Sequence, residues 1–209
     1  MEEPFETAGV QGILHRPEAG NGHVLALTHG AGSDCRAPLL ALLALAFESS
    51  GFVVLRYNLP YRQQRPKGPP FPAGAARDRA GIEQAVEAAR QLGSGRLFLG
   101  GHSYGGRQSA MVAAAQPGIA DALLLLSYPL HPPREPEKKR TAFFPELRIP
   151  ALFVHGTKDP FASVDELRDS MALIPARTDL LVVEGAAHDL SRAAGLFVEI
   201  TGRLQSLCG

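Results

Sequence analysis

The chain alternates short, strongly apolar runs with longer segments whose apolar residues recur every three or four positions. The apolar runs have the length of strands, and several are rich in β-branched or aromatic residues. Because they are apolar without interruption, they are typical of strands that are buried on both faces of a parallel sheet. The predicted strands are His23–His29, Phe52–Asn58, Arg96–Gly101, Asp121–Pro129, Pro150–Gly156 and Thr178–Gly185.

Helices are predicted between these strands. Pro38–Gly51 starts with proline and ends with glycine, an asymmetry that favours a helix, and Ala75–Gly93 carries apolar residues at helical spacing. The other predicted helices are Gly105–Gly118, Ser163–Leu173 and Ser191–Leu207. This alternation predicts an α/β fold, with a mostly parallel sheet covered by helices on both faces, in a single domain over residues 1–209.

Three segments depart from the alternation. Phe5–Pro17 is weaker and more polar, and it is a candidate antiparallel hairpin at the edge of the sheet. Residues 58–74 and 128–149 are proline-rich, charged and longer than usual connections, so they are candidate binding loops or lids. Neither is long enough for a cap domain.

Composition and charge narrow the class of protein. The 209 residues are 45% hydrophobic and 20% charged, and 21 basic residues balance 21 acidic ones. A neutral chain without a basic stripe gives no electrostatic reason to expect nucleic-acid binding. The longest apolar run, Leu39–Phe47, is shorter than the roughly 20 residues of a membrane span. We therefore expect no membrane partner.

Cysteine usage and the N-terminus bear on location. Cys35 and Cys208 are far apart and lack CxxC spacing, so neither a disulfide framework nor a zinc site is predicted. Cys35 is expected to be a thiol without a role. The acidic, polar start MEEPFE is not typical of a secretory signal. We expect a cytoplasmic protein, either a monomer or a homodimer.

One short motif points to chemistry. Gly101–Gly105 reads GHSYG, a G-x-S-x-G pattern that follows a predicted strand and opens a predicted helix. At such a turn the serine has a strained backbone, and small neighbours let the strand and helix approach closely. Ser103 is therefore a candidate nucleophile. The alternative is a tight turn in which Ser103 only caps the helix.

A serine nucleophile needs a base, and the base needs an acid to orient it. His188 follows the last predicted strand, and Asp159 follows the strand before it, so the order is Ser103, Asp159, His188. His188 would take the serine proton, and Asp159 would hold the imidazole. Asp189 and Asp165 are weaker candidates for the acid. Roles as a turn aspartate and a surface histidine are the alternatives for Asp159 and His188.

The oxyanion of the tetrahedral intermediate needs at least two donors. The amide of Tyr104 at the helix N-terminus is one candidate. The loop after the first central strand, THGAGSD over Thr28–Asp34, offers Ala31 as the other, with Gly32 as a possible donor and substrate contact. A plain strand-to-helix turn is the alternative for this loop.

Other side chains are candidates for the walls of the site. Phe161 and Tyr104 would form an acyl pocket, or they pack in the core. Arg107, one helical turn after Ser103, is expected to anchor the 58–74 loop through an acidic or carbonyl partner. A separate set of basic residues would line the mouth of the site and favour an acidic substrate, or else form a solvated loop: Arg56, Arg62, Arg65 and Lys67.

The motifs HGAGS, GHSYGG, GTKDPF and GAAHDL, in this order, resemble the α/β-hydrolase superfamily from about His23 to the C-terminus. More narrowly, THGAGSD, RYNLPYR and GHSYGGR resemble small, lidless bacterial hydrolases. These are related to the testis-expressed and histone-acetyltransferase-complex hydrolase-like proteins, and more distantly to dienelactone hydrolases. The resemblance implies a Ser–Asp–His triad and esterase-type chemistry. Dienelactone hydrolases carry a cysteine nucleophile, whereas residue 103 is serine.

The sequence thus predicts hydrolysis of a small carboxylic ester through an acyl-enzyme on Ser103, with a thioester or an amide as the alternative substrate. The substrate is a small molecule, and neither a metal nor an organic cofactor is required. Two alternatives stay open: a hydrolase-like scaffold that binds another protein, and a serine peptidase or acyltransferase on the same fold.

Overall fold

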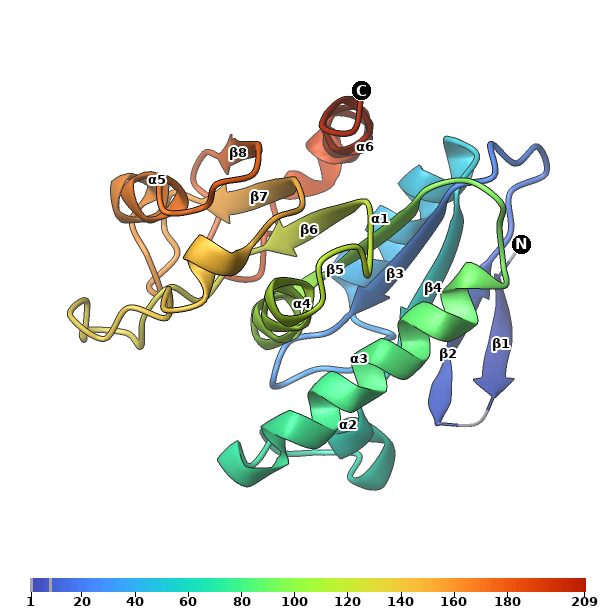
Figure 1. Ribbon diagram of the computed structural model, residues 1–209, viewed down its shortest axis with the longest axis horizontal. Helices are drawn as coiled ribbons and strands as arrows, with labels where there is room; N and C mark the ends of the chain where they lie inside the picture. Colours follow the sequence, from blue (N-terminus) through green and yellow to red (C-terminus); the bar gives the residue numbers. More distant parts are fainter. Residues whose placement is uncertain (1, 8) are drawn as a thin grey trace.

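The computed structural model describes residues 2–7 and 9–209, and these form an α/β sandwich around one eight-stranded sheet (Figure 1). The strand order is β1-β2-β4-β3-β5-β6-β7-β8. The strands are β1 (Glu2–Thr7), β2 (Val10–His15), β3 (Val24–Thr28), β4 (Val53–Tyr57), β5 (Leu97–His102), β6 (Ala122–Leu126), β7 (Ala151–Gly156) and β8 (Thr178–Val183).

The sheet is mostly parallel, as predicted. From β4 to β8 all neighbouring strands are parallel, while β1 and β2 form an antiparallel hairpin at the edge, and β2 pairs with β4. Every residue of β3 and of β6 is buried, which explains their uninterrupted apolar sequences.

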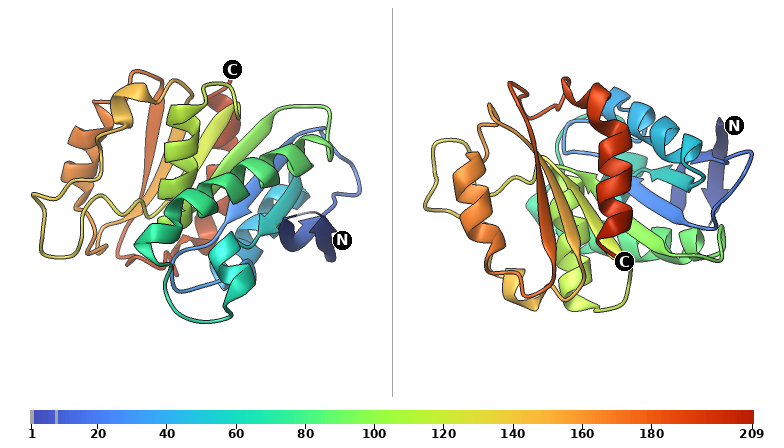
Figure 2. Two further views of the ribbon diagram at one scale, coloured as in Figure 1. Left: turned by 60° about the horizontal axis from the view of Figure 1, so that its bottom comes forward. Right: turned by 90° about the horizontal axis from the view of Figure 1, so that it is seen from above.

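Helices cover both faces of the sheet (Figure 2). One apolar core lies under α3, α4 and α5, and the other lies under α1 and α6. The helices are α1 (Pro38–Ser49), α2 (Pro60–Gln64), α3 (Ala75–Arg90), α4 (Tyr104–Ala115), α5 (Val164–Met171) and α6 (Phe197–Ser206). The layering is the predicted one.

Three details differ from the sequence expectation. The last helix begins at Phe197 rather than at Ser191, and a 3₁₀ turn, Ala193–Leu196, precedes it. The 58–74 loop contains the short helix α2 and a 3₁₀ turn, Pro72–Gly74. The 128–149 loop contains the 3₁₀ turn Phe144–Glu146.

No helix among residues 2–7 and 9–209 is both long and apolar enough to cross a membrane.

Candidate active site

Ser103 lies on a sharp turn between β5 and α4. Its φ of 51° and ψ of −116° are strained for a residue with a side chain. The approach of strand and helix is too close for side chains. A Cβ at Gly101 would lie 2.7 Å from the backbone nitrogen of Gly106, and one at Gly105 would lie 2.5 Å from the carbonyl oxygen of His29. These glycines therefore allow the turn that exposes Ser103.

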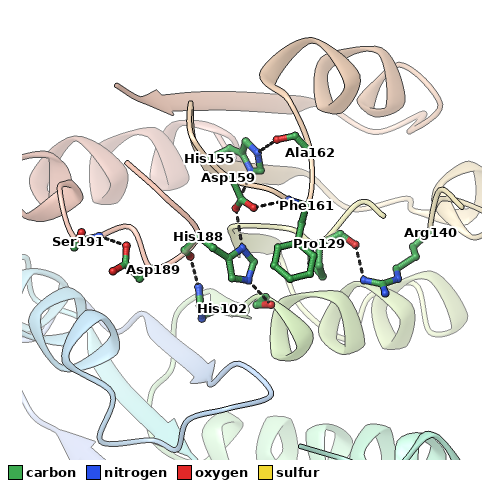
Figure 3. A network of polar contacts seen from close by, with 11 residues as sticks. His102, Pro129, Arg140, His155, Asp159, Phe161, Ala162, His188, Asp189 and Ser191 are labelled. Atoms are coloured by element: carbon green, nitrogen blue, oxygen red, sulfur yellow. Dashed lines mark hydrogen bonds and ion pairs between the residues drawn. The ribbon is translucent and has the colours of Figure 1, made fainter. Parts of the chain in front are cut away.

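The three predicted residues meet at the carboxyl ends of β5, β7 and β8. His188 Nε2 lies 2.8 Å from Ser103 Oγ, and His188 Nδ1 lies 2.8 Å from Asp159 Oδ2. Figure 3 shows the imidazole of His188 between the Asp159 carboxylate and the turn that precedes α4. This contact aligns a hydroxyl, an imidazole and a carboxylate in the order that proton transfer requires.

The charge of Asp159 determines which nitrogen of the His188 ring carries the proton. The Asp159 side chain is fully buried, which by itself raises the pKa of its carboxyl. The hydrogen bond and charge of His188, with the Phe161 N–H at 2.9 Å, outweigh burial and lower that pKa. The ionised carboxylate only accepts hydrogen bonds, so Nδ1 of His188 carries the proton and Nε2 is free to accept from Ser103.

The loop after β3, residues 29–34, is named the Ala31 loop, and it is held in place through its carbonyl groups. The Tyr61 hydroxyl lies 3.1 Å from the Gly30 oxygen and 3.0 Å from that of Ala31, and Arg62 donates to the oxygens of Ala31 and Ser33 at 3.2 and 2.8 Å. In a planar trans peptide the N–H points opposite to the C=O. Because the carbonyls point toward α2, the N–H groups of Ala31 and Gly32 point away from it.

Tyr104 begins α4, so its N–H is one of the donors that a helix start leaves without an intrahelical partner. Its phenol donates to the buried carboxylate of Asp78 at 2.8 Å, and the backbone N–H of Tyr61 donates to the other Asp78 oxygen. Asp78 thereby connects the start of α4 to α2, whose residues Tyr61 and Arg62 donate to the carbonyl oxygens of the Ala31 loop.

His102 was not among the predicted site residues. Its Nε2 donates to the carbonyl oxygen of His188 at 2.7 Å, as seen in Figure 3, because an oxygen acceptor requires the proton on that nitrogen. Burial lowers the pKa of His102, so the ring stays neutral. His102 is a positioning residue that holds the His188 loop, and its place inside the motif was the only sequence signal for it.

Two cavities meet at Ser103. One, of about 330 Å³, is lined by Gly32, His102, Ser103, Phe161 and His188, together with other residues of the Ala31 loop. The other, of about 480 Å³, runs from Ser103 along α4 between the two long loops. The Phe161 ring lies 4.3 Å from that of His188, and Phe161 and Tyr104 both line the larger cavity, as the acyl-pocket prediction requires.

The weaker candidates for the acid lie elsewhere. The Asp189 carboxylate accepts from the backbone N–H of Ser191, and Asp165 pairs with Arg168 at the surface.

The predictions for two arginines of the basic set are wrong. Arg56 is buried and forms hydrogen bonds with Glu2, His15 and the Cys35 carbonyl. Arg62 is buried where it donates to the carbonyl oxygens of the Ala31 loop. Irregular loops expose carbonyl oxygens, and an arginine with five donors can satisfy several of them.

The prediction for Arg107 also fails. Within residues 2–7 and 9–209, no hydrogen bond joins it to the 58–74 loop, and its Nε is buried without a partner. The positive charge of Arg107 faces the phenol of Tyr128 instead.

The described part of the chain has no group of three or more His, Cys, Asp or Glu side chains that could hold a metal ion.

The eight-stranded, mostly parallel sheet with helices on both faces has the α/β hydrolase fold. The chain belongs to the α/β hydrolase domain family, whose sequence model matches residues 21–204.

Solved structures with this fold cover almost the whole chain at low identity. An α/β serine hydrolase homologue from Coxiella burnetii has a TM-score of 0.76 at 17% identity, covering 100% of this chain and 97% of its own. Est1E from Butyrivibrio proteoclasticus has a TM-score of 0.78 at 16% identity, with 99% and 98% covered. XC6422 from Xanthomonas campestris, described as a serine hydrolase without a lid, has a TM-score of 0.74 at 18% identity, with 99% and 92% covered. These similarities establish the fold.

Proposed function

We propose that this hydrolase cleaves a small carboxylic ester through an acyl-enzyme on Ser103, with His188 as general base and acid and Asp159 as the residue that orients it. The observation that carries the proposal is the His188 imidazole, with one nitrogen 2.8 Å from Ser103 Oγ and the other 2.8 Å from Asp159. A hydroxyl in such a chain is a nucleophile at neutral pH.

In the first half-reaction Ser103 Oγ attacks the ester carbonyl carbon while its proton passes to His188 Nε2. The carbonyl oxygen becomes an oxyanion, which accepts hydrogen bonds from the N–H groups of Ala31 and Tyr104, and Gly32 lies beside them. His188 then returns the proton to the ester oxygen, the C–O bond breaks, and the alcohol leaves. The acyl group stays on Ser103.

In the second half-reaction His188 removes a proton from water, and the resulting hydroxide attacks the acyl carbon. The same two amides stabilise the second oxyanion. The bond to Ser103 breaks as its oxygen regains the proton from His188, and the carboxylic acid leaves. The charge that develops on His188 in each half-reaction is stabilised by the ionised Asp159.

The two cavities at Ser103, of about 480 and 330 Å³, have the volume of a small-molecule site, which supports a small ester as substrate. One similar structure is a dienelactone hydrolase from Anabaena variabilis, and another contains ferulic acid bound to Est1E. Both names are consistent with esterase chemistry on this fold. The narrower resemblance to the testis-expressed and histone-acetyltransferase-complex group stays a prediction.

The test is labelling with a fluorophosphonate probe, together with turnover of p-nitrophenyl acetate and butyrate, in the wild type, Ser103→Ala and His188→Ala. We expect stoichiometric labelling at Ser103, and turnover lost in both variants. Absence of labelling in a folded protein would contradict the triad and favour a binding scaffold. Labelling with activity only on peptides or on acyl acceptors other than water would favour a peptidase or an acyltransferase.

A further inference from the structure

The larger cavity lies on the acyl side of the site. His188 must protonate the departing alcohol, so the alcohol occupies the smaller cavity, which His188 lines. The cavity of about 480 Å³ includes Ser103 and Ala31 but not His188. The acyl chain of a bound ester therefore extends into this larger cavity, between the two long loops.

Two arginines line this acyl cavity, and the backbone of each is held in place. Arg107 lies one turn along α4 from Ser103, and its backbone N–H donates to the Ser103 carbonyl at 2.9 Å. Arg140 belongs to the 128–149 loop, where its N–H donates to the Leu130 oxygen at 2.7 Å and its carbonyl accepts from the Tyr128 hydroxyl at 2.6 Å. The backbones that carry both cations are thus held in place.

The cations have few partners in the free protein. Arg140 donates to the Pro129 carbonyl at 3.2 Å, and Figure 3 shows this contact beside Phe161. Arg107 interacts with the phenol of Tyr128, but its Nε is buried without a hydrogen-bond partner. Among the residues described, no carboxylate pairs with either side chain, and the cavity lining contains neither aspartate nor glutamate. Glu135, the acid that faces Arg140, is engaged by Lys138.

The two cations also act on each other. Burial, and next the positive charge of Arg107, lower the pKa of Arg140. Two like charges in one apolar cavity are unfavourable until an anion lies between them. A guanidinium binds a carboxylate with two parallel hydrogen bonds, which suits it to select an anionic group.

We infer that the preferred substrate is a half-ester of a dicarboxylic acid, whose free carboxylate binds between Arg107 and Arg140 while its ester carbonyl lies at Ser103. This inference rests on the proposed function and deepens it by naming the acyl group. The carboxylate takes no part in bond breaking. It anchors the far end of the acyl chain, so that the carbonyl carbon is presented to Ser103 Oγ.

The test compares two esters with six-carbon acyl chains, mono-p-nitrophenyl adipate and p-nitrophenyl hexanoate. Shorter half-esters are avoided because their own carboxylate attacks the ester carbonyl efficiently. The measured quantity is the ratio of kcat/KM for the adipate to that for the hexanoate. We expect the ratio to exceed about ten in the wild type, as for a charge-assisted contact.

Substitutions assign the preference to the two cations. Arg107→Gln and Arg140→Gln are each expected to lower the ratio about tenfold or more, and Arg140→Lys to restore part of it. Lys139→Gln is the matched control, because Lys139 is the exposed neighbour of Arg140 and does not line the cavity, so the ratio should stay unchanged. Melting curves of each variant show that the protein is folded.

A second measurement does not depend on turnover. Ser103→Ala should bind monomethyl adipate at least tenfold more tightly than methyl hexanoate by calorimetry, and Arg140→Gln in the same background should remove the difference. Equal affinities and a ratio near one would overturn the inference. If, in that case, the hexanoate is still hydrolysed and Ser103 is still labelled, the proposed function stands and only the inference about the half-ester is overturned. A folded protein with neither labelling nor turnover contradicts the proposed function itself.

Discussion

Substitution of Asp159 by asparagine isolates the role of the buried carboxylate. In the native site Asp159 Oδ1 accepts from the Phe161 N–H, and Oδ2 accepts from His188 Nδ1. Asparagine can keep the first bond with its oxygen, but it then presents an NH₂ group to the imidazole. His188 must adopt the opposite tautomer to accept from that group, so Nε2 carries a proton and cannot receive the one from Ser103.

The size of the expected loss in kcat follows from this change of tautomer. The number of hydrogen bonds around Asp159 is conserved, so the fold should survive, whereas the base is lost. Loss of the correct tautomer in such triads lowers kcat by about 10⁴. At 1.36 kcal/mol for each factor of ten, this is about 5 kcal/mol of transition-state stabilisation. The orienting role of Asp159 therefore predicts a large loss of rate with a small loss of stability.

The assay is kcat for p-nitrophenyl acetate, with melting temperature measured in parallel. Asp189→Asn is the matched control, since Asp189 is adjacent to His188 but its carboxylate accepts from the Ser191 N–H. We expect the control to retain wild-type kcat. Retention of more than a tenth of the wild-type kcat by a folded Asp159→Asn would refute the assigned role.

Three further predictions concern the supports of the site. Neutral His29 donates from Nδ1 to Gly30 at 2.9 Å and accepts at Nε2 from the Leu59 N–H, and burial lowers its pKa to about 4. The unfolded chain binds this proton near pH 6.5, so the free energy of unfolding should fall by about 1.4 kcal/mol per pH unit from there to about pH 4. Denaturant titrations at a series of pH values should show that the free energy of unfolding falls less steeply with decreasing pH in His29→Gln than in the wild type. Equal pH dependences would contradict the assignment. Arg62→Gln should lower kcat about tenfold with little change in KM, because the Ala31 loop acts on the transition state; a change in KM alone would contradict this. Gly101→Ala should lower the free energy of unfolding by about 1–3 kcal/mol and the melting temperature by roughly 2–12 °C, as measured by calorimetry. Gly32→Ala is the control, because a Cβ there has nothing within 4 Å, and it should melt like the wild type.

The sheet and the positions of the three reacting residues could be predicted from sequence because each depends on local pattern. Strands that are buried on both faces, such as β3 and β6, must be apolar throughout. Parallel strands bring their carboxyl ends to one edge, so residues that follow successive strands converge there. Ser103, Asp159 and His188 each follow such a strand. Their catalytic roles, the single-domain extent and the cytoplasmic location stay predictions.

The supports of the site could not be predicted because they are long-range and irregular. Arg62 lies in a proline-rich, charged segment that is typical of a solvated loop, yet it is buried because the carbonyls of the Ala31 loop need donors. Helix α2 has only five residues, too few for a helical period to be recognised. Arg140 lies in a loop without periodicity, so no pattern places it beside Arg107.

The residues around Ser103 come from two kinds of segment, the ends of strands and the two long loops, and this difference has an evolutionary consequence. The proposed catalytic residues follow parallel strands of the sheet, whereas the two long loops supply six of the thirteen residues that line the acyl cavity: residues 69–72, Pro129 and Arg140. Insertions and substitutions in surface loops are tolerated far better than changes in a buried sheet. Under the proposed function, changes in these two loops alter which acyl group is accepted, while the residues that follow the strands stay the same.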